Sequence, residues 1–156
     1  MSRSDVVQKI GPSAIVSQSK DEILFSTVPM RSVYFEYYDC FFDQNGRLWS
    51  INAWSKTMPT KSDGEDLRDS FDTLKAGLED KYGKVLYVIG GSGSEIKWTD
   101  IEGSWKLFTG AYWDGSGEYS KSIHIHKIAL EVEHMDNDHG FISLDYEFTT
   151  LIEGPL

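Results

Sequence analysis

Histidines near the C-terminal end are the side chains best suited to chemistry, because imidazole binds metals and exchanges protons near neutral pH. The chain has four, and His124 and His126 alternate on an expected strand, so both could reach one ion from the same face. His134 and His139 lie roughly 25 Å farther along, at about 3.3 Å per residue. They cannot complete the same site. We therefore predict neither a metal site nor a cofactor.

Two aspartates accompany the second pair of histidines. Asp136, Asn137 and Asp138 resemble part of a calcium-binding loop. The ligand spacing and the closing glutamate of such a loop are absent. We predict a solvated turn at this position, with Asp136 and Asp138 exposed.

Nucleophilic and phosphate-binding motifs are missing from the rest of the sequence. Cys40 lies in an aromatic segment, which predicts a buried and inert thiol. The glycine-rich residues 90–94 lack the lysine of a phosphate-binding loop, and no Gly-x-Ser-x-Gly motif occurs. No set of acid, base and nucleophile can be assembled, so we predict that the protein is not an enzyme. A metal-dependent hydrolase that uses the histidines is the second alternative to the function given below.

Charge is the next informative property. The chain has 25 acidic and 15 basic residues, a formal net charge of -10. This balance argues against nucleic acid and against anionic membranes as partners. The last 29 residues contain seven acids and no lysine or arginine. Such a segment suits either solubility or docking of a basic partner.

Aromatic residues are abundant, with five Trp, eight Tyr and eight Phe. These side chains favour strands and half-buried sheet surfaces. Most should enter the core, and the remainder would be available to a ligand or a partner. Exposed tryptophans and tyrosines therefore support an alternative function, a small-ligand or carbohydrate-binding module.

Local patterns predict the elements that position these residues. Residues 32–42 and 47–57 are aromatic and β-branched, and Asn45-Gly46 between them is a strong hairpin signal. Short strands are expected at 22–27 and 84–89. A helix is expected over 63–81, because Ser62 and Glu65 fit a capping box, the apolar residues recur on one face, and Gly83 ends it. Residues 95–103 suggest a second, short helix, and residues 105–114 a strand.

The C-terminal residues predict a long hairpin between 122–134 and 141–148. Its apolar residues shift by one position near His126 and Lys127, which indicates a β-bulge. Pairing the apolar residues sets Val132 opposite Ile142 and Leu130 opposite Leu144. It likewise sets Ile128 opposite Tyr146 and Lys127 opposite Glu147. The other face of the hairpin then carries Glu131, Glu133, Asp145 and Glu147.

The order of these elements predicts an α+β fold. We expect an antiparallel sheet of about five to six strands with one main helix packed on one face. Residues 1–156 should form a single domain, with residues 1–20 loosely ordered around Gly11-Pro12. The single cysteine and the absence of an apolar leader or membrane-length segment predict a cytoplasmic protein.

An acidic, stable domain without catalytic residues is typical of a binding protein. We predict a small acidic module that neutralises or regulates a protein partner with a basic surface, in the manner of an inhibitor or an immunity protein. The residues predicted to bind that partner are Glu131, Glu133, Asp136, Asp138, Asp145 and Glu147.

Overall fold

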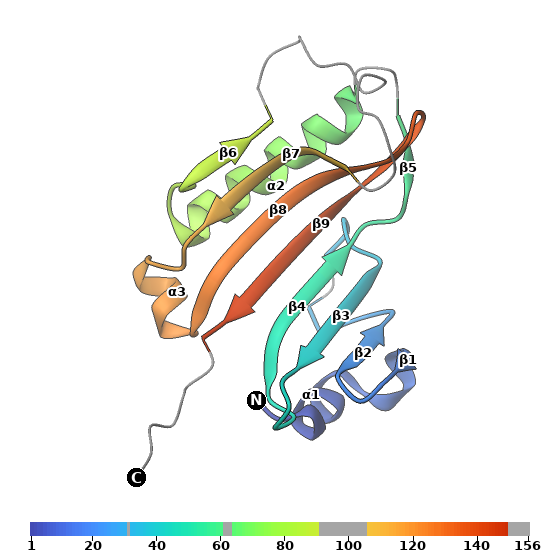
Figure 1. Ribbon diagram of the computed structural model, residues 1–156, viewed down its shortest axis with the longest axis vertical. Helices are drawn as coiled ribbons and strands as arrows, with labels where there is room; N and C mark the ends of the chain where they lie inside the picture. Colours follow the sequence, from blue (N-terminus) through green and yellow to red (C-terminus); the bar gives the residue numbers. More distant parts are fainter. Residues whose placement is uncertain (31, 61–63, 91–105, 150–156) are drawn as a thin grey trace.

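The computed structural model describes residues 1–30, 32–60, 64–90 and 106–149 (Figure 1). Its helices are α1 (Arg3–Ile10), the 3-10 helix η1 (Pro12–Ala14), α2 (Glu65–Tyr82) and α3 (Glu118–Ser122). Its strands are β1 (Ile15–Gln18), β2 (Glu22–Phe25), β3 (Tyr37–Phe42), β4 (Leu48–Trp54), β5 (Met58–Pro59), β6 (Tyr87–Ile89), β7 (Lys106–Trp113), β8 (Ile125–Asp136) and β9 (His139–Phe148). The fold is mixed α and β.

The described strand pairs are all antiparallel and belong to one sheet. The strand order is β1-β2-β3-β4-β9-β8-β7-β6, with the short β5 paired to β9. The central contact joins β4 to β9, two strands that are far apart in the sequence. This contact unites the N-terminal and C-terminal hairpins in one surface.

The hydrophobic core lies on one face of the sheet. The helix α2 packs there against β7, β8 and β9, and buries Leu67, Phe71, Leu78 and Tyr82. The helix α1 contributes Val6 to the same core. In Figure 1, α2 lies behind the sheet. The opposite face therefore carries no described helix, and side chains on it are available to the surroundings.

The predicted main helix is confirmed at Glu65–Tyr82. Gly64 precedes it in a left-handed conformation with φ of 67°, and Glu65 and Asp66 occupy the first turn, where negative charge favours the helix dipole. Gly83 ends the helix at φ of 90°, as predicted. The proposed capping residue, Ser62, and the short helix expected at 95–103 lie outside the described residues.

Both predicted hairpins are present. Asp43 accepts hydrogen bonds from the backbone N–H groups of Asn45 and Arg47, which stabilises the turn between β3 and β4. In the C-terminal hairpin, every predicted pair is found, from Val132 with Ile142 to Lys127 with Glu147. The β-bulge is also found, because the register shifts between Ile125 and Lys127.

The extent of the sheet differs from the prediction. Within the described residues it has nine strands rather than five to six, and three α-helices accompany it rather than one main helix. Two of the strands, β1 and β5, match none of the predicted strand segments, and they have only four and two residues, too few to show an alternating pattern. Short strands of this kind depend on their sheet neighbours, which the local sequence does not specify.

The N-terminal segment is likewise more regular than the predicted loose order. Ser2 caps α1 by accepting from the Asp5 N–H, and Asp5 accepts from the Ser2 N–H in return. This reciprocal pair is a capping box with aspartate in the place usually held by glutamate. Val6 is then buried, which attaches the segment to the core.

Candidate binding face of the sheet

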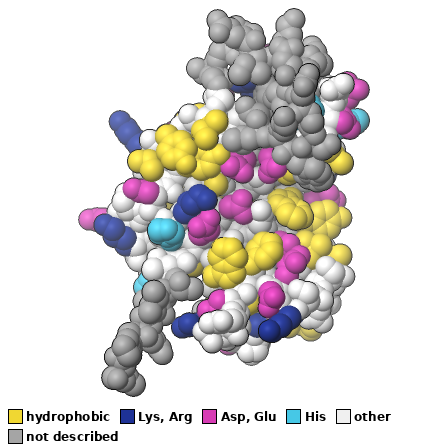
Figure 2. Space-filling model, viewed as in Figure 1, with side chains coloured by type: hydrophobic (Ala, Val, Ile, Leu, Met, Phe, Trp, Pro, Cys, Tyr) yellow, Lys and Arg dark blue, Asp and Glu magenta, His cyan; other side chains and the backbone are white. Residues whose placement is uncertain are grey.

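The face of the sheet opposite α2, on which no described helix lies, carries a compact group of acidic residues. On β8 and β9, residues that alternate with Leu130, Val132 and Leu144 must point away from the core. These residues include Glu131, Glu133, Asp145 and Glu147, which we call the acidic face. Figure 2 shows acidic side chains in the middle of this face, with hydrophobic side chains on either side.

Neighbouring strands hold two of these carboxylates in place. The Tyr112 hydroxyl donates to Glu131 Oε1 at 2.6 Å, and the Ser143 hydroxyl donates to Glu133 Oε1 at 3.0 Å. Both donors are neutral. The two glutamates are therefore oriented by hydrogen bonds without any compensation of their charge.

A single ion pair lies at the edge of the group. Lys127 Nζ is 2.9 Å from Glu147 Oε1, as the predicted cross-strand position implies. Within the part of the chain that the structure describes, Lys127 is the only cation that forms an ion pair with the acidic face. The charge of Glu131, Glu133 and Asp145 remains largely uncompensated.

Two carboxyl groups of the acidic face have raised pKa values. Burial, followed by the charge of Glu131, raises the pKa of Asp145 to about 6, although Lys127 opposes the shift. Burial also raises the pKa of Glu133. A positive charge brought to this face would reverse both effects, because it favours the ionised carboxylates.

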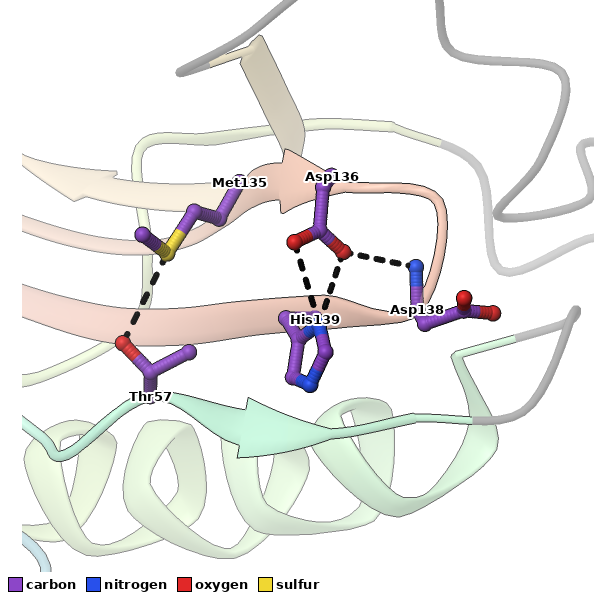
Figure 3. A network of polar contacts seen from close by, with 5 residues as sticks. All are labelled: Thr57, Met135, Asp136, Asp138 and His139. Atoms are coloured by element: carbon purple, nitrogen blue, oxygen red, sulfur yellow. Dashed lines mark hydrogen bonds and ion pairs between the residues drawn. The ribbon is translucent and has the colours of Figure 1, made fainter.

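The remaining predicted residues, Asp136 and Asp138, lie elsewhere. They occupy the turn at the tip of the β8–β9 hairpin and are exposed. Asp136 accepts from the Asp138 N–H at 2.8 Å, and its carboxylate is 2.8 Å from His139 Nδ1 (Figure 3). The hydrogen bond from Asp138, followed by that with His139, lowers the pKa of Asp136. The charge of Asp136 is thus paired within the turn. Asp136 lies about 10 Å along the strand from Glu133, at roughly 3.3 Å per residue.

The expected shared strand face for His124 and His126 is wrong. His124 precedes β8 in a left-handed conformation with φ of 59°, so the two residues do not alternate on a strand. Among the described residues, no group of three or more His, Cys, Asp or Glu side chains lies close enough to hold a metal ion. Cys40 is 2% exposed, and burial raises the pKa of its thiol to about 12, which is typical of an unreactive cysteine.

Two polar residues on the same face were missed by the sequence analysis. Asp39 on β3 is paired with Asn52 on β4, and Asn52 is paired with Asp145 on β9. Burial, followed by a hydrogen bond with Glu22, raises the pKa of Asp39 to about 7. The available signal was an aspartate inside the otherwise apolar segment YYDCFF. Together these residues extend the polar surface from the acidic face across the sheet.

Aromatic side chains border this polar surface. Trp54 and Tyr37 are cross-strand partners on one side, 37% and 38% exposed. On the other side, Tyr87 stacks on Tyr112 with ring centroids 4.6 Å apart. Charged groups in the centre and partly exposed rings at the margin form a surface that can combine electrostatic attraction with apolar burial.

Comparison with known proteins finds no family model, no curated protein and no solved structure that matches the chain. None of the described helices is both long and apolar enough to cross a membrane.

Proposed function

We propose that the acidic face binds a protein partner with a basic surface, and that the protein neutralises or regulates this partner as an inhibitor or an immunity protein does. The observation that carries the proposal is the state of Glu131, Glu133 and Asp145. These carboxylates are half-buried on the sheet face opposite α2, and among the described residues Lys127 forms an ion pair only with Glu147.

Electrostatic repulsion within this group works against the free protein. Burial, followed by the like charge of Glu131, raises the pKa of Asp145, which means that ionisation there is costly before any partner arrives. Lysine or arginine side chains on a partner would turn that repulsion into attraction. Because the carboxylates are already partly desolvated, less of the binding energy would be lost in removing water from them.

The geometry supports a revised set of contact residues. Glu131, Glu133, Asp145 and Glu147 share one face and serve as the centre of the proposed interface. The partly exposed rings of Trp54, Tyr37 and Tyr87 supply its apolar margin. Asp136 and Asp138 lie at the tip of the hairpin and would contact only a partner that extends along β8 and β9.

The test is capture of partners from a lysate of the organism that encodes the protein, at low and high salt. Wild type should retain a basic protein at low salt and release it at high salt, because salt screens the attraction. The double variant Glu131→Lys, Glu133→Lys should capture none of it. The matched control Asp72→Lys, Asp80→Lys makes the same change in net charge on the exposed side of α2 and should bind as wild type does.

Stability of the variants is checked by thermal unfolding. If the lysine variant does not fold, Glu131→Gln with Glu133→Gln removes the charge and keeps acceptors for Tyr112 and Ser143. Equal capture by wild type and the glutamine variant would show that this face is not the interface. Loss of capture in the α2 control would indicate a response to net charge alone.

The second candidate function is carbohydrate or small-ligand binding. The observation in its favour is the exposure of Trp54 and Tyr37 on adjacent strands. A ligand that stacks on these rings would shift tryptophan fluorescence at both low and high salt. Absence of a shift across a panel of saccharides would remove this candidate.

A further inference from the structure

A pocket of about 450 Å³ opens at the aromatic margin beside Glu133. It is formed where β3, β4 and β9 lie next to each other, and its walls include Tyr37, Trp54 and Phe141. We call it the Trp54 pocket. Its volume lies in the range of roughly 300–1,000 Å³ found for ligand sites. It is therefore large enough to receive a side chain of a partner.

Two of the polar residues that line the Trp54 pocket are glutamates. Glu36, which directly precedes β3, and Glu133 on β8 both line the pocket. Neither forms an ion pair within the described part of the chain. Glu133 is held by Ser143 through Oε1. Two carboxylates beside aromatic rings form a combination that attracts a cation.

An amide oxygen adds a third acceptor. Asn52 lines the pocket, and its Oδ1 atom is buried without a hydrogen-bond donor among the described residues. Its cross-strand partners, Asp39 and Asp145, are carboxyl groups. A buried acceptor left without a donor is unfavourable in free energy. A donor from outside the chain would recover that free energy.

We propose that the Trp54 pocket binds the guanidinium group of an arginine side chain that the basic partner inserts into it. This inference rests on the proposed function and identifies its anchoring contact. A guanidinium group is planar and has five donors, so it can stack on an indole ring while it donates to carboxylate and amide oxygens. A lysine ammonium lacks the flat surface, and a saccharide lacks the charge.

Lys56 also lines the pocket and is exposed. Its ammonium repels a bound guanidinium and limits the affinity of the pocket. Substitutions within this one pocket should therefore change its affinity for a cation in opposite directions. Removal of Glu36 or Glu133 charge should weaken binding of a cation, and removal of Lys56 charge should strengthen it.

The test uses N-acetyl-L-arginine amide as the probe and its neutral analogue N-acetyl-L-citrulline amide as the control ligand. Binding is followed through the indole N–H resonance of Trp54 in two-dimensional NMR spectra, assigned by its loss in Trp54→Phe. The arginine probe should shift this resonance to saturation, and the citrulline analogue should not. Glu36→Gln and Glu133→Gln should each weaken binding about tenfold, and Lys56→Gln should tighten it several-fold.

Glu118→Gln on α3 is the matched control, because this exposed carboxylate does not line the pocket. It should leave the affinity unchanged. Equal shifts with arginine and citrulline probes, or unchanged affinity in both pocket glutamine variants, would overturn the inference. So would a saturating shift with methyl glycosides in place of the arginine probe.

The outcomes separate this inference from the proposed function. Suppose that a basic partner binds through the acidic face but the arginine probe does not shift the Trp54 resonance. That result would refute arginine binding in the pocket and leave the proposed function standing. A saturating shift with the arginine probe supports the pocket, even where capture from a lysate fails and refutes the wider function.

Discussion

Tyr112 on β7 donates its hydroxyl to Glu131 on β8 at 2.6 Å, and its ring lies over Gly110. A β-carbon added at Gly110 would be 2.7 Å from the Tyr112 hydroxyl oxygen. Gly110 is itself the cross-strand partner of Glu131. The absence of a side chain at position 110 thus leaves space for the tyrosine to reach the glutamate and orient it on the acidic face.

Removal of the Tyr112 hydroxyl should destabilise the protein. In Tyr112→Phe, Glu131 loses its donor while the ring and its stacking on Tyr87 remain. We expect the free energy of unfolding to fall by about 1–2 kcal/mol, measured by chemical denaturation at neutral pH. Tyr87→Phe is the control, because the Tyr87 hydroxyl forms no hydrogen bond to the described residues and should cost little. Equal losses in the two variants would contradict the assignment.

An alanine at position 110 should also destabilise the protein. Gly110 has no positive φ, so alanine fits the backbone and would ordinarily add about 0.4–1 kcal/mol of stability. Here its methyl group displaces the Tyr112 ring and breaks the hydrogen bond with Glu131. We therefore expect Gly110→Ala to lower stability in wild type and to be neutral or stabilising in a Tyr112→Ala background. A double-mutant cycle measures this difference, and identical effects in both backgrounds would disprove the coupling.

The C-terminal hairpin could be predicted in detail because its information is local. Ile128, Leu130 and Val132 alternate without interruption, and the one-residue offset from Ile125 marks the bulge. The observed register places these residues opposite Ile142, Leu144 and Tyr146 of β9, and a shift by one residue would move the apolar side chains to the other face. The positions of Glu131, Glu133 and Asp145 on the other face follow directly from that register.

The rest of the polar surface depends on strand order, which no local pattern contains. Asp39 and Asn52 join the acidic face only because β4 pairs with β9, whose residues are more distant in sequence than any hairpin partner. The role of Gly110 likewise requires knowledge that Tyr112 folds back over it. Asp136 and Asp138 were assigned to the site by their charge alone, and the length of β8 places them beyond it.

Asp39 should make the protein more stable at mildly acidic pH than at alkaline pH. Its pKa is raised from 3.8 to about 7 in the folded state, so between these values the folded chain holds a proton that the unfolded chain has released. Stability is then lost as pH rises through about 7. Asparagine does not ionise and so loses no stability as pH rises. We expect the stability of Asp39→Asn relative to wild type to increase by on the order of 2 kcal/mol between pH 5 and 8.

Chemical denaturation across that range measures the difference. Asp43→Asn is the control, because the pKa of Asp43 is shifted in the direction opposite to that of Asp39. The pKa of Asp43 is lowered, first by the hydrogen bond from the Arg47 N–H, so its contribution is present at neutral pH and is lost as pH falls below 3.8. Parallel pH profiles for wild type and Asp39→Asn would show that Asp39 does not hold the proton.

Asp145 should make binding of the basic partner dependent on pH. Its pKa is about 6 in the free protein, and a nearby positive charge favours the ionised form, so binding lowers that pKa and releases a proton. Affinity should therefore fall as pH drops through 6, by about three- to tenfold between pH 7 and 5.

Titration calorimetry in two buffers of different ionisation enthalpy measures both the affinity and the proton release. Asp145→Asn should flatten the profile, whereas Asp80→Asn on α2 should retain it, because only Asp145 lies among the carboxylates that the partner is proposed to contact. A profile that stays steep in Asp145→Asn would assign the proton to another group.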